Sequence, residues 1–169
     1  EFGADAVYFG LPDFSLRARI NQFQQNEIRK GAEACRNKGK KFYITINIYA
    51  HNSHLKALPE HLKFLKEIKP DGIILSDPGL LRFIKKELPE ASLHLSTQAN
   101  ATNVEAAKFW QEQGLERVVL ARELSLQEVS EIKKEVPELE LECFVHGAMC
   151  MAYSGRCMLS KWMTGRSAN

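Results

Sequence analysis

Short runs of apolar residues alternate with longer amphipathic segments along the whole chain. Six runs are rich in branched and aromatic residues, as expected for strands: Ala6–Gly10, Lys41–Ile48, Gly72–Ser76, Ser92–Gln98, Arg117–Arg122 and Glu140–Gly147. Between them, apolar residues recur every three or four positions, which is the period of an α-helix. The pattern therefore predicts strand and helix in alternation, with about six strands and five helices.

Each predicted helix has an apolar face, and several have recognisable ends. The residues of these faces are Ile28, Ala32 and Cys35; Leu55, Leu58, Leu62, Leu65 and Ile68; Leu80, Leu81, Ile84 and Leu88; Val104, Ala107 and Trp110; and Leu126, Val129 and Ile132. Asp77 followed by Pro78 is a typical helix start, and Ser125 to Glu128 has the pattern of a capping box. Gly39 and Gly114 supply helix stops.

Alternating strands and helices are typical of parallel strands joined by right-handed crossovers. The spacing suits a TIM-like (β/α)₈ barrel or an open doubly wound sheet. Six strands are too few to close the barrel, but the chain starts without Met, and Gly3 has the pattern of a helix end. We therefore expect residues 1–169 to form a partial (β/α) barrel catalytic domain of the α/β class. It would lack its first strand and its C-terminal continuation.

Polar residues alternate with apolar ones in three of the predicted strands. Since the apolar side chains must face the helices, the polar ones should face the opposite side of the sheet. This polar set comprises Asn47, His94, Ser96, Gln98, Glu142 and His146. Their convergence on one interior favours a barrel with a ligand-binding lumen. The alternative is an internal hydrogen-bond network without a ligand.

The composition restricts the class of protein only modestly. With 44% hydrophobic and 26% charged residues and a formal net charge of +2, the chain shows no strongly basic coat. No apolar run approaches the roughly 20 residues of a membrane span, so we expect a cytoplasmic protein without a membrane partner. The absence of nucleophile-elbow, Walker, GxGxxG and HExxH motifs disfavours a conventional hydrolase, kinase or dehydrogenase.

Two of the four cysteines follow the last predicted strand in a segment of small residues. Cys150 and Cys157 lie in a segment that also contains Gly, Ala and Ser, which should leave their sulfur atoms approachable, although small buried fillers are the alternative. Two thiolates do not complete a zinc site or an iron–sulfur cluster. His146 is the nearest candidate for a further ligand, and its alternative role is that of a hydrogen-bonded barrel histidine. Cys35 and Cys143 fall on apolar faces and fit an inert role.

Charged residues near the predicted strand ends add further candidates. Glu142 and Glu123 are candidate general acids or bases, while Arg122 and Glu123 alternatively form a structural ion pair. Basic residues interleaved with aromatic ones are typical of RNA-binding surfaces, although most such clusters are solvated surface. The arginines in question are Arg17, Arg19, Arg156 and Arg166.

Several motifs together resemble a known family. The run Glu142-x-Phe-x-His-Gly-Ala-x-Cys150-x-Ala-Tyr-Ser-Gly-x-Cys157-x-x-Ser160 resembles the signature of the collagenase-like peptidases, the peptidase family numbered thirty-two among those of unknown catalytic type. Further segments typical of this family are Gly3–Gly10, Ser15–Arg19, Ser76–Gly79, His94–Asn100 and Ala121–Ser125. The resemblance covers essentially the whole chain.

The resemblance implies a function as well as a fold. Ser15–Arg19 and Phe109-Trp110 are most similar to bacterial members that form 5-hydroxyuridine in tRNA, and Thr164–Asn169 is also similar to members that hydroxylate a ribosomal RNA cytidine. Similarity to quinone-hydroxylating relatives implies a 4Fe–4S cluster on four cysteines. Cys150 and Cys157 match the first two, and the others are expected after residue 169. The tRNA pathway of the family implies prephenate as co-substrate.

The leading hypothesis is therefore an RNA-modifying enzyme that acts on tRNA or another structured RNA. Gln98, Asn47 and His146 would orient a flipped pyrimidine, and the two loop cysteines would help to hold a redox metal centre. A metal-assisted peptidase with Glu142 and His146 at its active site is the first alternative. A ribosomal RNA cytidine hydroxylase and a non-catalytic scaffold domain are the others.

Overall fold

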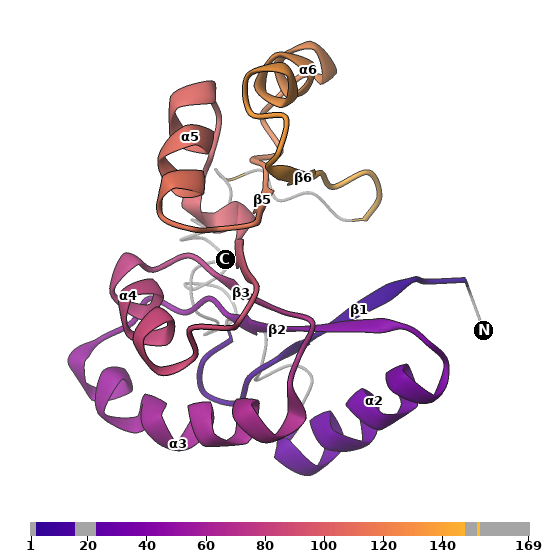
Figure 1. Ribbon diagram of the computed structural model, residues 1–169, viewed down its shortest axis with the longest axis vertical. Coiled ribbons are helices and arrows are strands. Elements are labelled where there is room, and N and C mark those ends of the chain that lie inside the picture. Colours follow the sequence, from indigo (N-terminus) through magenta and orange to yellow (C-terminus); the bar gives the residue numbers. More distant parts are fainter. Residues whose placement is uncertain (1–2, 16–22, 148–151, 153–169) are drawn as a thin grey trace. The chain divides into compact units, whose positions relative to one another are not determined.

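The computed structural model of the chain describes residues 3–15, 23–147 and 152 (Figure 1). The chain divides into two compact units, the first ending at Ser92 and the second beginning at Leu93. Each unit is built from parallel strands connected through helices, as the alternation of apolar runs and amphipathic segments predicts.

The first unit has three parallel strands in its described part. β1 (Ala6–Gly10) pairs with β2 (Lys41–Ile46), which pairs with β3 (Gly72–Leu75). Each strand is followed along the chain by a helix, namely α2 (Gln25–Asn37), α3 (Asn52–Ile68) and α4 (Pro78–Glu87). Figure 1 shows α2 and α3 below β1 and β2, on the same side of these strands.

The second unit repeats this arrangement. β4 (Leu93–Leu95) pairs with β5 (Arg117–Val119), which pairs with β6 (Glu140–Glu142), all parallel. A 3₁₀ turn, η1 (Thr97–Ala99), comes directly after β4 and precedes α5 (Val104–Glu112), and α6 (Leu126–Glu135) connects β5 to β6. Because the strands of each unit are parallel, their carboxyl ends lie at the same edge of the sheet.

The helix ends follow the local signals in the sequence. Asp77 Oδ1 accepts a hydrogen bond from the Leu80 N–H at 2.8 Å, with Pro78 in the first turn. Ser125 and Glu128 form the predicted capping box, and these hydrogen bonds from Ser125 lower the pKa of the Glu128 carboxyl. Gly39 and Gly114 have φ of +61° and +77°, which a side chain would disfavour.

The core of the first unit lies around β2. Phe42 to Ile46 are all buried, so the second face of this strand is covered as well as the face toward the helices. The largest side chains under 2% exposed include Phe14, Phe42, Ile44, Leu58, Leu65, Leu80 and Ile84. Burying side chains of this size stabilises the fold by roughly 1.5–3 kcal/mol each before the entropy of ordering is counted.

Three strands end at least three residues earlier than predicted, and one of them, predicted over 117–122, stops at Val119. The strand predicted over 92–98 stops at Leu95, because the Ser96 side chain caps η1 by accepting from the Gln98 N–H at 3.5 Å. The strand predicted over 140–147 stops at Glu142. Val145 is 94% exposed and Cys143 is exposed, so the expectation that both face the helices was wrong.

One predicted helix face is also shorter than expected. Leu126, the first residue of α6, is 88% exposed, whereas Ile132 is buried. A side chain in the first turn points back beyond the helix start, and no neighbour among the described residues covers Leu126 there. Within the part of the chain that the structure describes, no helix is long and apolar enough to cross a bilayer.

Gly10 provides a test of the packing at the end of β1. An added Cβ would lie 2.7 Å from Ser15 Oγ and 2.8 Å from Ser15 Cβ. Gly10→Ala should therefore lower the free energy of unfolding by about 1–3 kcal/mol through overpacking. Chemical denaturation of the full-length protein measures this loss. The double variant Gly10→Ala/Ser15→Gly should recover part of it, whereas wild-type stability of the single variant contradicts the clash.

Candidate active site at the strand ends

A buried polar cluster lies at the carboxyl ends of β1 and β2. Thr45 Oγ1 is 3.0 Å from Ser15 Oγ and 3.3 Å from the Phe9 carbonyl oxygen, and both hydroxyl residues are buried. The Phe14 carbonyl accepts hydrogen bonds from the backbone N–H groups of Asn47 at 2.9 Å and Ile48 at 3.3 Å. These contacts fix the loop of residues 11–15 to the end of β2. Asn47 is half-buried at this strand end, as the sequence predicted.

His61 of α3 lies beside this loop. Its ring centroid is 4.8 Å from that of Phe14, and its Nδ1 is buried without a hydrogen-bond partner among the described residues. Burial lowers the pKa of His61, and the nearby carboxylates of Asp13 and Glu60 oppose this shift. The environment therefore favours the neutral imidazole.

The lowered pKa of His61 predicts acid sensitivity of the first unit. An unfolded histidine has a pKa of about 6.5, so below that pH the unfolded state binds more protons than the folded state. The stability contribution of neutral His61 should be complete above pH 6.5 and decline as the pH falls through the lowered folded pKa. Denaturation midpoints measured between pH 7.5 and about 5 should show this decline. His61→Gln should reduce it, and His146→Gln, at an exposed position, should leave it unchanged.

In the second unit, the turn after β4 is tied to the end of β5. Thr97 Oγ1 donates to the Leu120 carbonyl at 3.0 Å, and the Ala121 N–H donates to the Ala101 carbonyl at 3.2 Å. Gln98 is half-buried within η1 instead of extending a strand. The turn ends at Asn100, whose φ of +53° is the left-handed conformation that asparagine tolerates.

Arg122, three residues after the end of β5, places its guanidinium group over an aromatic ring. The Arg122 Cζ atom lies 4.5 Å from the centroid of the Phe144 ring, and Phe144 follows β6 and is 44% exposed. Arg122 Nε is buried and has no hydrogen-bond partner among the described residues. Glu123, a candidate acid or base, is exposed immediately after it.

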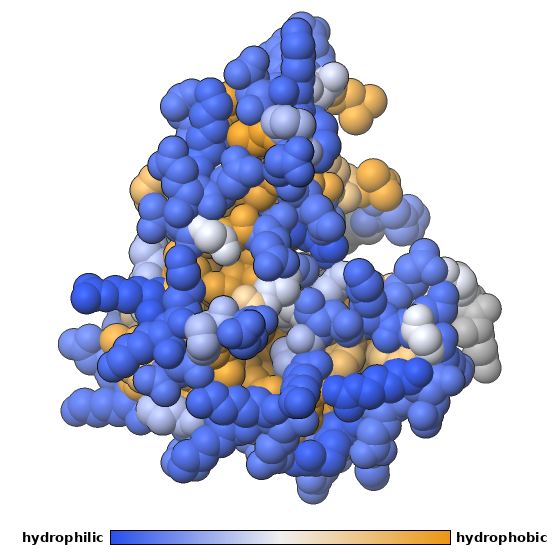
Figure 2. All heavy atoms as spheres, viewed as in Figure 1, coloured by the Kyte–Doolittle hydropathy of each residue, from blue (hydrophilic) through white to orange (hydrophobic). Residues whose placement is uncertain are grey.

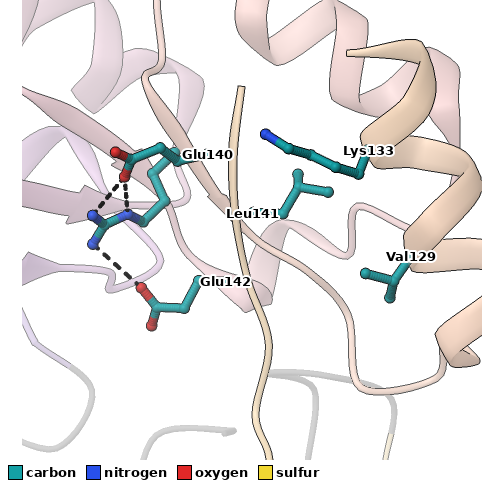
Figure 3. A pocket seen from close by; sticks show the side chains of 6 residues that line it. Val129, Lys133, Glu140, Leu141 and Glu142 are labelled. Atoms are coloured by element: carbon teal, nitrogen blue, oxygen red, sulfur yellow. Dashed lines mark hydrogen bonds and ion pairs between the residues drawn. The ribbon is translucent and has the colours of Figure 1, made fainter. Parts of the chain in front are cut away.

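Glu142, at the end of β6, shares an arginine with Glu140. Arg117 Nη2 lies 2.6 Å from Glu140 Oε2, and Arg117 Nη1 lies 3.5 Å from Glu142 Oε2 (Figure 3). The parallel register pairs Arg117 with Glu140 and places all three side chains on one face of the sheet. Glu142 is thus an ion-pair partner as well as a candidate acid or base. Sequence reasoning missed Arg117, because its pairing with the two glutamates depends on the register of β5 against β6.

The opposite face of β6 packs on α6. Leu141 points toward Val129 and Lys133 of that helix, as Figure 3 shows. Together with Arg117 and the two glutamates, these residues line an open depression of about 520 Å³. The alternation predicted for this strand is therefore confirmed for residues 140–142, where Leu141 faces the helix and Glu142 faces away.

Beyond β6, Cys143 and His146 are both exposed. Partial burial, with a smaller effect of the Glu142 carboxylate, raises the pKa of the Cys143 thiol, which disfavours the reactive thiolate. The remaining candidates lie outside the described residues: Cys150, Cys157, Arg17, Arg19, Arg156 and Arg166. Within residues 3–15, 23–147 and 152, no group of three or more His, Cys, Asp or Glu is arranged to hold a metal ion.

The five predicted site residues that the structure describes lie at or after strand ends. Gln98, Glu123, Glu142 and His146 follow or end the neighbouring strands β4, β5 and β6 in the second unit, and Asn47 follows β2 in the first. Carboxyl ends of parallel strands are where catalytic residues gather in α/β barrels. The second unit therefore contains the better-defined candidate site. Asn100 and Arg122 also have buried polar atoms there, although sequence reasoning gave neither of them a role in the site.

The fold is that of an incomplete parallel α/β barrel. The solved structure of the U32 peptidase Mk0906 matches it with a TM-score of 0.72, over 88% of this chain and 63% of that one, at 18% sequence identity. The model of peptidase family U32 matches residues 1–169. The chain belongs to peptidase family U32, as its motifs indicated.

Curated relatives share the sequence across nearly all of this chain. tRNA hydroxylation protein P of Escherichia coli (strain K12) is 51% identical over 168 residues, which are 99% of this chain and 37% of that protein. The 23S rRNA 5-hydroxycytidine C2501 synthase of the same organism is 36% identical over 167 residues, which are 99% of this chain and 25% of that protein. The chain therefore spans well under half the length of these relatives.

Proposed function

We propose that this chain is part of an RNA-modifying enzyme that hydroxylates a pyrimidine, with 5-hydroxyuridine in tRNA as the product. The observation that carries this proposal is the 51% identity with tRNA hydroxylation protein P over 99% of the chain. Polar side chains at the strand ends of the second unit support it, because a pyrimidine needs hydrogen-bonding groups to be read and oriented.

In this proposal, the candidate residues have distinct roles. Gln98 and His146 of the second unit orient the flipped base, and Glu142 and Glu123 hold or move a proton. Arg117 positions the Glu142 carboxylate through the contact at 3.5 Å. The RNA backbone is bound by the candidate arginines that lie outside the described residues, since guanidinium groups pair well with phosphates.

A 4Fe–4S cluster is part of the proposal. Cys150 and Cys157 would supply two of its thiolate ligands, because thiolates are the usual ligands of such clusters, and the other two would come from outside residues 1–169. The cluster would supply redox chemistry, with prephenate as co-substrate.

Gene deletion tests the proposal at the level of the product. In a bacterium that carries this gene, deletion should remove 5-hydroxyuridine from total tRNA, and expression of the full-length protein should restore it. Mass spectrometry of digested tRNA measures the nucleoside. Unchanged 5-hydroxyuridine would contradict the proposal. Loss of 5-hydroxycytidine from 23S rRNA instead would favour ribosomal RNA as the substrate, in line with the 36% identity to the rRNA enzyme.

Peptidase activity is the second candidate function, which the family name favours. It predicts gelatin cleavage by the purified full-length protein that a chelator inhibits and that Glu142→Gln abolishes. Glu140→Gln is the matched control, because Glu140 shares the Arg117 ion pair but is not an active-site candidate. Equal loss of gelatin cleavage in both variants would indicate that the ion pair with Arg117 is required and that Glu142 has no separate catalytic role.

A further inference from the structure

Two buried polar atoms near the ends of β4 and β5 have no hydrogen-bond partner among the described residues. They are Asn100 Oδ1, an acceptor, and Arg122 Nε, a donor. Leaving a buried polar atom without a partner is costly, so such atoms usually meet a ligand or an ordered water molecule. The pair combines one acceptor with one donor, which restricts the ligands that satisfy both.

The orientation of the Asn100 amide is set by the turn itself. Asn100 Nδ2 donates to the Gln98 carbonyl at 3.3 Å, which leaves Oδ1 as the atom that needs a donor. The left-handed backbone at Asn100 and the bond from its N–H to the Thr97 carbonyl at 3.0 Å hold the residue in this turn. The acceptor is therefore presented by a fixed backbone.

The Arg122 guanidinium is also held in place. Its Cζ atom lies 4.5 Å from the Phe144 ring centroid, a distance at which the cation and the aromatic face attract. Asn100 and Arg122 adjoin Ala101 and Ala121, whose backbones are joined by a hydrogen bond of 3.2 Å. Both groups therefore belong to one small region at the carboxyl ends of neighbouring strands.

The chemistry of the two atoms distinguishes between ligand classes. A carboxylate or phosphate would satisfy Arg122 but offers no donor to Asn100 Oδ1, and its charge would repel that oxygen. The imide edge of uracil carries an N3–H group between two carbonyl oxygens, so it offers a donor for Asn100 Oδ1 and an acceptor for Arg122 Nε. We propose that Asn100 and Arg122 bind the uracil edge of the substrate nucleotide, with Oδ1 accepting from N3–H and the guanidinium donating to a ring carbonyl.

This inference rests on the proposed RNA hydroxylation. Replacing the N3–H group of the substrate uridine by N3–methyl tests it. The probe is a transcript of the tRNA that loses 5-hydroxyuridine in the deletion strain, carrying uridine or N3-methyluridine at the modified position. Dissociation constants for the full-length protein are measured by fluorescence anisotropy. Wild type should bind the uridine form at least about tenfold more tightly, because the methyl group removes the donor to Asn100.

Asn100→Gly should reduce this preference to nearly one, since glycine keeps the left-handed turn but removes the amide. Arg122→Lys keeps the charge but loses the planar guanidinium and Nε, so the KM for hydroxylation should rise about tenfold. Arg82→Lys, at an exposed position on α4, is the control and should leave KM unchanged.

The possible outcomes separate the two proposals. An unchanged preference in Asn100→Gly, or equal binding of both transcripts by wild type, overturns the uracil site while hydroxylation itself stands. Equal weakening of both transcripts by Asn100→Gly indicates a structural role for the amide and also overturns the site. If wild type neither binds nor modifies the tRNA, the proposed function fails and the uracil site fails with it.

Discussion

Replacing Cys150 by alanine in the full-length protein should abolish 5-hydroxyuridine formation and lower the iron content. A methyl group cannot ligate iron, and a 4Fe–4S cluster bound through cysteine uses four thiolates. Cys150 and Cys157 are the two cysteines that the proposal assigns to the cluster, and they lie in a segment that also contains Gly, Ala and Ser residues. The loss should therefore be nearly complete.

The measurements are the iron-to-protein ratio, the visible absorbance of the purified protein, and the 5-hydroxyuridine content of tRNA in a complemented deletion strain. Cys35→Ala is the matched control, because Cys35 lies half-buried on α2 and is not a proposed ligand. It should keep both iron and product. Full product formation by Cys150→Ala would remove Cys150 from the proposed ligand set.

The sequence predicted the elements well where one physical signal dominated. The apolar face of α3 and the capping residues Asp77 and Ser125 are local features, so periodicity and cap chemistry were sufficient to predict them. The buried strand β2 was also predicted, because β-branched and aromatic residues are concentrated there. These features do not depend on knowing the partners in space.

Strand ends were less predictable, because side chains compete there with strand pairing. Ser96 was counted as a strand residue, but its hydroxyl caps the turn that follows. The alternation of Cys143 and Val145 continued the strand pattern, yet the strand pairing of β6 with β5 ends at Glu142, and Val145 is 94% exposed. The alternation of apolar and polar residues predicts which side of the sheet a side chain faces only as far as the strand is paired with a neighbouring strand.

The candidate site likewise contains residues that the sequence identified and residues that only the structure identified. Glu142 and Gln98 were identified because they end or follow a predicted strand, which is sequence information. The ion pair of Glu142 with Arg117 depends on strand register, and the missing partners of Asn100 Oδ1 and Arg122 Nε depend on burial. Neither register nor atomic burial can be obtained from periodicity, so these residues required the structure.

Phe14→Ala should lower the free energy of unfolding by about 3–5 kcal/mol, the usual cost of removing a buried aromatic ring. The ring is 1% exposed, and its centroid lies 4.8 Å from that of His61 and 6.0 Å from that of His54. Its removal would leave a cavity beside the loop that is hydrogen-bonded to the end of β2 through the Phe14 carbonyl. The destabilisation should therefore extend to the segment that positions Asn47.

Chemical denaturation of the full-length variants measures this effect, and Phe109→Ala is the matched control. Phe109 is 52% exposed on α5, so the same change there should cost no more than about 1 kcal/mol. Water entering the cavity left by Phe14 would also hydrate the imidazolium of His61 and reduce the burial that lowers its pKa. The acid sensitivity due to His61 should consequently weaken in Phe14→Ala but persist in Phe109→Ala. Equal stability losses in the two variants would contradict the packing of Phe14 against α3.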